Sequence, residues 1–361
     1  MLMEKKLSDR QVELDVIKAV AIIAVVLVHT TSLSYSYFPR NGIGWSSLLV
    51  IDQLTRFCVP VFVALSGYGL GIKNMDIGRD YNQFFRRRVV KLLPWYLFWS
   101  GIIYFYIRLG DEWNHVGHYS IWKIIFMGKA DYHLYFVPMI VSLYLIFPLM
   151  AILIKKFGWR IIIFLGFLQA LLYFFTSLEA EKIIKLGFSW GDQQQYLFFG
   201  SWIFYFALGI YLNFLPGVMS KKNYLIKLVA IMLVILGLLF ILVDAFRLVG
   251  GGADIIAATR FTRIPVMVFA TGFILWSLVW RKFWLGFPRI FIWIGERSFI
   301  IYLSHTLILR ELLELLKPND FVNFISYFLL AFMLSTILAE VAFQVARFLS
   351  KQKFHKLLIR F

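Results

Sequence analysis

The sequence predicts an all-α integral membrane protein with about ten transmembrane helices and with both termini in the cytoplasm. Of its 361 residues, 61% are hydrophobic and 19% aromatic, and the mean hydropathy of +0.77 is far too high for a soluble domain. Apolar runs of about 20 residues, the length that crosses a bilayer as a helix, recur along the chain. The basic residues gather in alternate connections between these runs, which is typical of a polytopic protein.

The apolar runs define ten predicted spans. The ends of a span are predicted less accurately than its existence. The first run contains charged residues and lacks a small-residue cleavage site, which favours a retained span over a signal peptide. We see no internal repeat and no linker to a soluble domain, so we expect one membrane domain over residues 1–361. In chain order the predicted spans are 14–33, 46–70, 89–107, 134–154, 161–177, 196–214, 224–243, 264–280, 298–309 and 321–348, and the ninth could extend at either end.

The net charge of +17 is explained by where the basic residues lie. If the N-terminus is cytoplasmic, most of the 37 lysines and arginines fall in inner connections, as the positive-inside rule requires. An odd number of spans would break this pattern, so the sequence favours an even number. The charge therefore predicts orientation in a bilayer, and we expect no nucleic-acid partner. Cys58 is the only cysteine, which excludes an internal disulfide and a thiolate metal site.

The first predicted span carries three titratable groups, Asp15, Lys18 and His29. Eleven residues separate Lys18 from His29, which places both on one face of a helix, roughly 16 Å apart along its axis. Asp15 and Lys18 could simply sit at the membrane interface, and His29 could be a satisfied buried histidine. Ionisable groups at depth in a membrane are costly and typically functional, so we expect a direct chemical role for His29.

Four ionisable groups share the outer half of the predicted membrane domain: His29, Asp52, His133 and His305. A histidine beside a carboxylate is the smallest general-base pair, because the carboxylate orients the ring and stabilises its cation. We expect Asp52 to serve His29 in this way. The three histidines could instead bind a metal, but they lack a ligand spacing such as HxxxH, and we expect no metal.

The run FFRRRVVKLLPWY, residues 84–96, gathers basic side chains at the start of the third span. Arg86 and Arg87 are interpreted as charges that fix the orientation. Arg88 and Lys91 lie three residues apart and therefore face the same side of a helix. With Pro94 deeper in the span, these two could also fix orientation or could form a cationic pocket for phosphate groups.

Two outer connections leave alternatives open. Residues 120–126, SIWKIIF, could form a short helix on the membrane surface or part of a plain loop between Gly110 and Asp131. The three glycines at 250–252 allow either a flexible lid or a tight backbone turn.

Five segments, in the family's own order, resemble the membrane acyltransferase type 3 family, the polytopic O-acyltransferases of bacterial surface polysaccharides. LDVIKAVAIIAVVLVH is similar to the family's first helix, with Lys18 where the family usually has Arg. VPVFVALSGYGL is similar to its Ser-Gly-Tyr segment. RRVVKLLPWY resembles its basic motif, with Lys91 in place of the second Arg. The segments that begin YHLYFVP at Tyr132 and IGERSFIIYLSH at Ile294 resemble its His-Leu-Trp-Phe and Tyr-Leu-x-His segments.

The resemblance implies acyl transfer from cytoplasmic acyl-CoA, with acetyl the expected group, to a hydroxyl of a cell-surface or lipid-linked glycan outside a bacterial plasma membrane. No cofactor is expected to stay bound. His29 would act as general base or carry the acyl group briefly, with Asp52 orienting it. The donor would be held by Arg88 and Lys91, with Lys18 supporting a polar channel along the first helix. Further residues of the matching segments would bind substrate or support the site: Ser66, His133, Glu296 and His305.

The chain stops at Phe361 without the extracytoplasmic esterase-like domain of many relatives, so it resembles the stand-alone members. A transporter of a polysaccharide or lipid-linked glycan is the alternative, because buried charges can also line a substrate path. Against it, we see no pair of short, Gly- or Pro-broken spans in two related halves. The acceptor glycan, the oligomeric state and any separate extracytoplasmic partner stay open.

Overall fold

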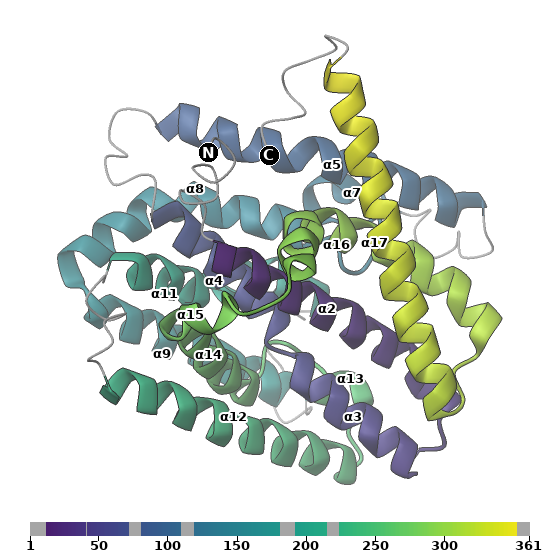
Figure 1. Cartoon of the computed structure of the whole chain (residues 1–361). Coiled ribbons are helices and arrows are strands. Elements are labelled where there is room, and N and C mark those ends of the chain that lie inside the picture. The colour runs from purple at the N-terminus through teal and green to yellow at the C-terminus, as the bar shows by residue number, and fades with distance from the viewer. Residues whose placement is uncertain are drawn as a thin grey trace. The chain divides into compact units, whose positions relative to one another are not determined.

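A computed structural model describes residues 12–40, 42–71, 81–109, 119–180, 192–214 and 224–351, and all regular secondary structure within these ranges is helical (Figure 1). Seven candidate membrane spans in them are long and apolar enough to cross a bilayer, and two shorter apolar helices accompany them. The predicted class, a helical multi-pass membrane protein, is confirmed. The count of ten spans stays a prediction, as does the cytoplasmic location of both termini, which lie outside the described residues.

The chain divides into two compact parts, which are described separately below. The first part comprises Met1–Ser66 and Leu212–Glu340, and the second comprises Gly67–Tyr211 and Val341–Phe361, as far as these ranges are described. The prediction of one membrane domain over residues 1–361 stays a prediction.

The first part is centred on two parallel helices, α2 (Val12–Ser34) and α16 (Arg289–Leu316). A Cβ atom on Gly295 of α16 would collide with the backbone carbonyl of Asp15, so the helices touch at one end through backbone. Further along, Leu33 of α2 packs on a buried cluster that includes Leu309 of α16. Because residue numbers rise together along the contact, the helices run in the same direction. A glycine in α16 thus allows the polar faces of both helices to approach closely.

The ninth predicted span, 298–309, is only the centre of α16. Arg297 was expected in an inner connection, but it lies inside this helix and is 6% exposed. Its guanidinium pairs with Glu340 of α17 (Phe321–Lys351) and lies 4.4 Å from the ring centroid of Trp293. At the other end of the same contact, the Tyr327 hydroxyl donates to the Leu309 carbonyl over 2.9 Å. Helices α16 and α17 therefore form an antiparallel hairpin that neutralises a buried arginine.

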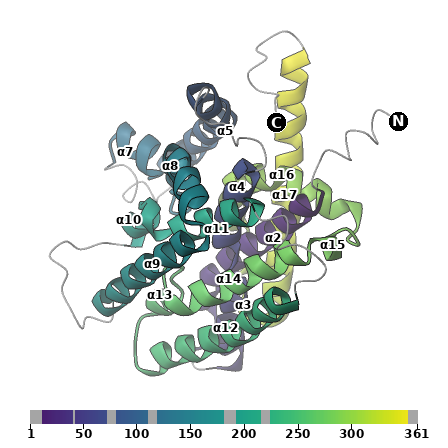
Figure 2. The same ribbon diagram turned by 90° about the vertical axis from the view of Figure 1, so that its left-hand side faces the viewer.

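Helices α12 (Tyr224–Gly250) and α14 (Ile264–Val279) form an antiparallel pair, side by side in both views (Figure 2). A Cβ atom on Gly237 would lie 2.6 Å from the Cα atom of Phe269, and one on Gly272 would lie 2.6 Å from the amide nitrogen of Val234. Neither position has room for a side chain, so the two glycines determine how closely α12 and α14 pack.

The glycines at 250–252 form a tight turn, which decides between the two predicted alternatives. The Ala253 amide donates to the Leu248 carbonyl over 3.0 Å, and the Gly252 amide donates to the Val249 carbonyl over 3.0 Å. Gly252 has a φ of 83°, the left-handed conformation that glycine adopts without steric cost. This bonding pattern is a Schellman helix end, which satisfies the last carbonyls of α12.

The second predicted span, 46–70, is two helices, α3 (Ile43–Thr55) and α4 (Cys58–Gly71). Pro60 has no amide hydrogen and cannot donate to the Arg56 carbonyl four residues back, so the helical ladder is interrupted there. The Arg56 amide instead bonds to the Gln53 carbonyl over 3.3 Å, which closes α3. The break places Arg56 at a helix end within a run otherwise apolar enough to span a membrane.

The second part contains α5 (Tyr81–Leu109), α7 (Ile121–Met127), α8 (Phe136–Phe157) and α9 (Trp159–Ala180). Of the two structures predicted for SIWKIIF, a short helix or a plain loop, the short helix is confirmed as α7. The Tyr96 hydroxyl of α5 donates to the Ile124 and Ile125 carbonyls of α7 over 3.0 and 2.8 Å, while the Trp122 and Phe126 side chains are exposed. An anchored helix with bulky apolar side chains on its open face suits a membrane surface.

The sixth predicted span, 196–214, is also interrupted, into α10 (Asp192–Leu197), the 3₁₀ turn Phe199–Ser201 and α11 (Ile203–Phe214). The break is held by side chains. The Gln169 side-chain oxygen accepts from the Phe204 amide over 3.0 Å, and the Trp202 indole donates to the Tyr196 carbonyl over 2.8 Å. These bonds replace helical ones at the start of α11.

Candidate active site

Two of the predicted site residues, His29 of α2 and His305 of α16, lie side by side. Their ring centroids lie 5.1 Å apart, and the ring planes are tilted by 37°. His305 is fully buried, and His29 is half-buried. The Gly295 contact lies earlier along both helices. It holds α2 and α16 close together, and the two histidine rings meet further along. Two imidazoles at this distance can share one substrate proton or acyl group.

The hydrogen bond at His305 fixes which of its nitrogens can act as a base. Its Nδ1 lies 2.8 Å from the Tyr302 carbonyl oxygen, one turn earlier in α16. A carbonyl only accepts hydrogen bonds, so Nδ1 carries the hydrogen, and in a neutral ring Nε2 is then the acceptor. The backbone of α16 thus performs for His305 the orienting task that a carboxylate performs in other histidine bases.

Asp52, predicted to orient His29, is fully buried and bound to its own helix neighbours. The Arg56 Nε donates to Asp52 Oδ2 over 2.8 Å, and the Arg56 Nη2 bonds to Oδ1. The Gln53 amide donates to Oδ2 over 2.8 Å. Two-pronged pairing of this kind is the strongest arrangement between a carboxylate and a guanidinium. Asp52 is therefore a partner of Arg56, and its role toward His29 stays a prediction.

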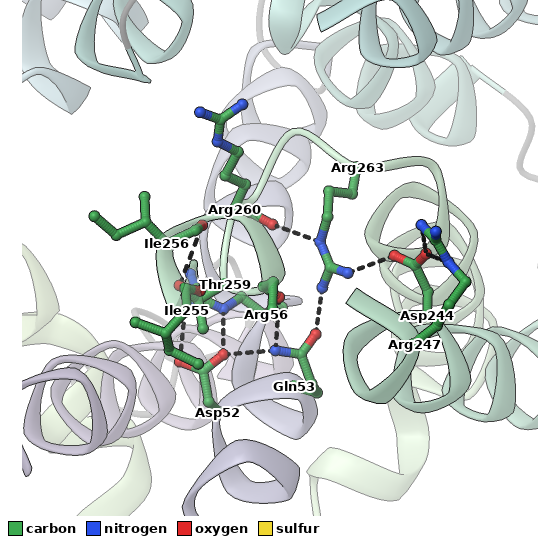
Figure 3. Close-up of polar contacts among 11 residues, drawn as sticks. Asp52, Gln53, Arg56, Asp244, Arg247, Ile255, Ile256, Thr259, Arg260 and Arg263 are labelled. Atoms are coloured by element: carbon green, nitrogen blue, oxygen red, sulfur yellow. Dashed lines mark hydrogen bonds and ion pairs between the residues drawn. The ribbon is translucent and has the colours of Figure 1, made fainter. Parts of the chain in front are cut away.

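The Asp52 pair belongs to a polar network that joins α3 with α12 and with the segment before α14 (Figure 3). Gln53 donates to the Ala258 carbonyl over 3.1 Å and accepts a hydrogen bond from Arg263. Arg263 also pairs with Asp244 of α12, which pairs in turn with Arg247 over 3.1 Å. Burial lowers the pKa of the Arg263 guanidinium, and Asp244 opposes this shift. Arg263 stays charged, since arginine does not deprotonate in proteins.

Two other predicted residues lie near the opposite end of the α2–α16 pair. Lys18 is 38% exposed at its side chain and donates to Asp15 Oδ1 over 3.1 Å. Glu296 accepts from the Arg297 Nη1 over 2.9 Å. Both therefore lie beside the Gly295 contact rather than beside the two histidines, and Lys18 keeps part of its surface open to a ligand.

His133, in the second part, has a carboxylate beside it. Its Nδ1 lies 3.5 Å from Asp131 Oδ2, and both side chains are almost fully buried. The Asp131 Oδ1 accepts from the Tyr132 amide over 2.8 Å, which holds the carboxylate in place. The sequence prediction named Asp52 as the carboxylate partner of a histidine and did not include Asp131. The sequence DYH, in which Asp131 precedes His133 by two residues, could have indicated it.

The basic residues of α5 differ in exposure in the way the sequence suggested. Arg86 and Arg87 are exposed, whereas Arg88 and Lys91 are half-buried. Pro94 lies inside the helix, one turn further along. Arg88 and Lys91 are thus partly covered by the protein, and their role in binding phosphate stays a prediction.

The SGY segment of α4 has a packing role. A Cβ atom on Gly67 would collide with the Phe206 carbonyl of α11, so only glycine fits there. Ser66 is half-buried beside it. Among the residues that the structure describes, no three histidine, cysteine, aspartate or glutamate side chains gather in a way that could hold a metal ion.

These features define a helical multi-pass membrane protein with two adjoining histidines, one buried and one half-buried, on parallel helices. A protein-family model described as an acyltransferase domain matches residues 11–341, nearly the whole chain. The chain therefore belongs to the acyltransferase type 3 family, and it is an acyltransferase. No curated protein and no solved structure matches it.

Proposed function

We propose that this membrane acyltransferase moves a short acyl group, with acetyl the expected one, from cytoplasmic acyl-CoA to a hydroxyl of a cell-surface or lipid-linked glycan. The observation that carries the proposal is the contact between His29 and His305, because hydroxyl acylation needs a base and this pair supplies two adjoining imidazoles. The plasma membrane is the proposed location.

In the proposed reaction, His29 accepts the proton of the acceptor hydroxyl, and the hydroxyl oxygen attacks the thioester carbonyl of the donor. A carbon–oxygen bond forms, the carbon–sulfur bond breaks, and the proton passes to the departing coenzyme A thiolate. In the second version, His29 first takes the acyl group and then passes it to the hydroxyl. His305 lies against His29 and offers Nε2 to hold a proton in either version, which supports both.

The donor is proposed to bind at Arg88 and Lys91 through the phosphates of coenzyme A. A half-buried guanidinium and ammonium on one helix face suit phosphate oxygens, which accept charge-assisted hydrogen bonds. Lys18 is proposed to support the polar face of α2, and Ser66, Glu296 and His133 to support the site. Asp52 is proposed to orient His29 while it remains paired with Arg56.

The test is the acyl content of the surface glycans of cells with and without this protein, measured by mass spectrometry. We expect deletion to remove acyl groups while the glycan still reaches the surface. Glycan that accumulates inside the cell with its acyl groups intact would contradict the proposal and favour a transporter. Re-expression of the wild-type chain is the control, and it should restore the acyl groups.

A further inference from the structure

Within the described part of α5, more than one buried polar group lacks a hydrogen bond, the Ser100 hydroxyl and the Trp99 indole nitrogen among them. The Trp99 indole nitrogen is buried, and it has no hydrogen-bond partner among the residues that the structure describes. The whole residue is only 3% exposed. An unsatisfied buried N–H group is unfavourable, and such a group in a native structure needs an explanation.

Another buried polar group of α5 is satisfied by the neighbouring helix α7. The Tyr96 hydroxyl, three residues earlier and equally buried, bonds to two backbone carbonyls of α7. The described residues therefore provide acceptors for Tyr96 and none for Trp99. An indole nitrogen only donates, so whatever satisfies Trp99 must present an acceptor.

The position of Trp99 connects it with the proposed donor site. Steps of three, four and four residues lead from Arg88 through Lys91 and Trp95 to Trp99, and these steps keep all four side chains on one helix face. The stripe is roughly 16 Å long at 1.5 Å per residue. It begins with two half-buried cations and ends with a buried neutral donor.

We propose that Trp99 donates a hydrogen bond to an amide carbonyl of the pantetheine arm of acyl-CoA, whose phosphates lie at Arg88 and Lys91. The order of groups along the stripe matches the order of groups in the donor: phosphates first, then a linear uncharged chain with two amides. This inference rests on the proposed function, because it concerns the same donor. It adds a binding residue that no motif in the sequence marks.

The test uses Trp99→Phe, which removes the indole nitrogen and keeps an aromatic ring. Purified full-length protein in lipid nanodiscs is titrated with acetyl-CoA by calorimetry, and its thermal unfolding is recorded without ligand. We expect the Kd for acetyl-CoA to rise about 2- to 12-fold, the range for one hydrogen bond. Without ligand, we expect Trp99→Phe to unfold at the same or a higher temperature, because it deletes an unsatisfied donor.

Two variants are the controls. Trp122→Phe changes an exposed tryptophan of α7 and should leave both measurements unchanged. Tyr96→Phe removes a satisfied hydroxyl and should lower the unfolding temperature. If the wild type binds acetyl-CoA and Trp99→Phe binds it equally well, the inference about Trp99 is wrong. If the wild type binds neither acetyl-CoA nor coenzyme A, the proposed donor itself is wrong.

Discussion

His305 is the residue whose surroundings bear most directly on the chemistry. Its Nδ1–H group donates to the Tyr302 carbonyl, so Nε2 is the basic nitrogen of a ring that lies beside His29. Asparagine at this position retains a donor for the carbonyl but has no ring. We expect His305→Asn to lower kcat and to leave the donor KM unchanged. The fall in kcat should be smaller than the roughly 10² to 10⁴ typical of losing the base itself.

The pH dependence of kcat shows whether His305 takes part in the reaction or only packs against His29. We expect the pH profile of kcat to change in the His305→Asn variant, because one of two adjoining imidazoles is lost. An unchanged kcat together with an unchanged pH profile would contradict a role for His305 in the reaction.

Arg88 allows a second test with single residues. If it binds phosphate, Arg88→Gln should weaken donor binding by roughly 1.5 to 3 kcal/mol. This corresponds to a rise in donor KM of about 10- to 150-fold. Lys91→Arg should be tolerated, because the guanidinium also binds phosphate. Donor KM is measured in inverted membrane vesicles at equal protein levels.

The exposed Arg86 provides the matched control for this measurement, since Arg86→Gln removes the same charge two residues away. We expect it to leave the donor KM unchanged. Equal effects of Arg86→Gln and Arg88→Gln would show that general charge at the membrane surface, and not a pocket at Arg88, attracts the donor.

The sequence was informative about which residues matter and much less about which ones meet. His29 and His305 were both selected because ionisable groups in apolar spans are costly. Their contact could not be predicted, because it depends on how α2 and α16 pack through Gly295. Arg263 was overlooked for a related reason. It stands before an apolar run like any connecting arginine, and only the fold brings Gln53 and Asp244 to it.

At the scale of helices, Gly295 is the position where a single methyl group should matter most. An alanine there would drive its Cβ atom into the Asp15 carbonyl, and backbone cannot move aside cheaply. We expect Gly295→Ala to destabilise the protein by about 1 to 3 kcal/mol, the range for overpacking. It should also lower acyl transfer, because the histidine pair depends on the same helix contact. Thermal unfolding in detergent measures the first effect.

Gly69→Ala is the control for Gly295→Ala, because a Cβ atom at Gly69 of α4 would meet nothing within 4 Å. We expect this variant to be as stable as the wild type or slightly more so, since alanine favours helix over glycine. Equal unfolding temperatures of both variants would contradict the close contact between α2 and α16.

Helix ends were the least predictable feature of the elements. The run 46–70 reads as one span by hydropathy, and the structure divides it because Pro60 cannot donate to Arg56. The prediction left the ends of the run 298–309 open, and the helix extends beyond both of them. The charged neighbours of this run, including Arg297, suggested a connection, whereas Glu340 and Trp293 allow that arginine to lie inside α16. A local proline decided the first case, and a partner from a distant helix, Glu340, decided the second.

For the molecule as a whole, the orientation in the membrane can be tested with single cysteines. Cys58 is buried and would be replaced by alanine first. Lys156 and Glu314 are both exposed, and the predicted topology puts Lys156 inside and Glu314 outside. We expect an impermeant thiol reagent to label Glu314→Cys in intact cells and to label Lys156→Cys only after the membrane is opened. Labelling of Lys156→Cys in intact cells would reverse the orientation.

The central claim is that His29 carries the chemistry of this acyltransferase, and acyl transfer by His29→Ala tests it most directly. Deletion cells carrying wild-type or His29→Ala protein, at equal levels in the membrane, are compared for acyl groups on the surface glycan by mass spectrometry. Loss of one half-buried imidazole should leave α2 intact, so we expect normal insertion and a rate lower by about 10² to 10⁴. Acyl transfer within threefold of wild type would contradict the account and reduce His29 to a structural residue.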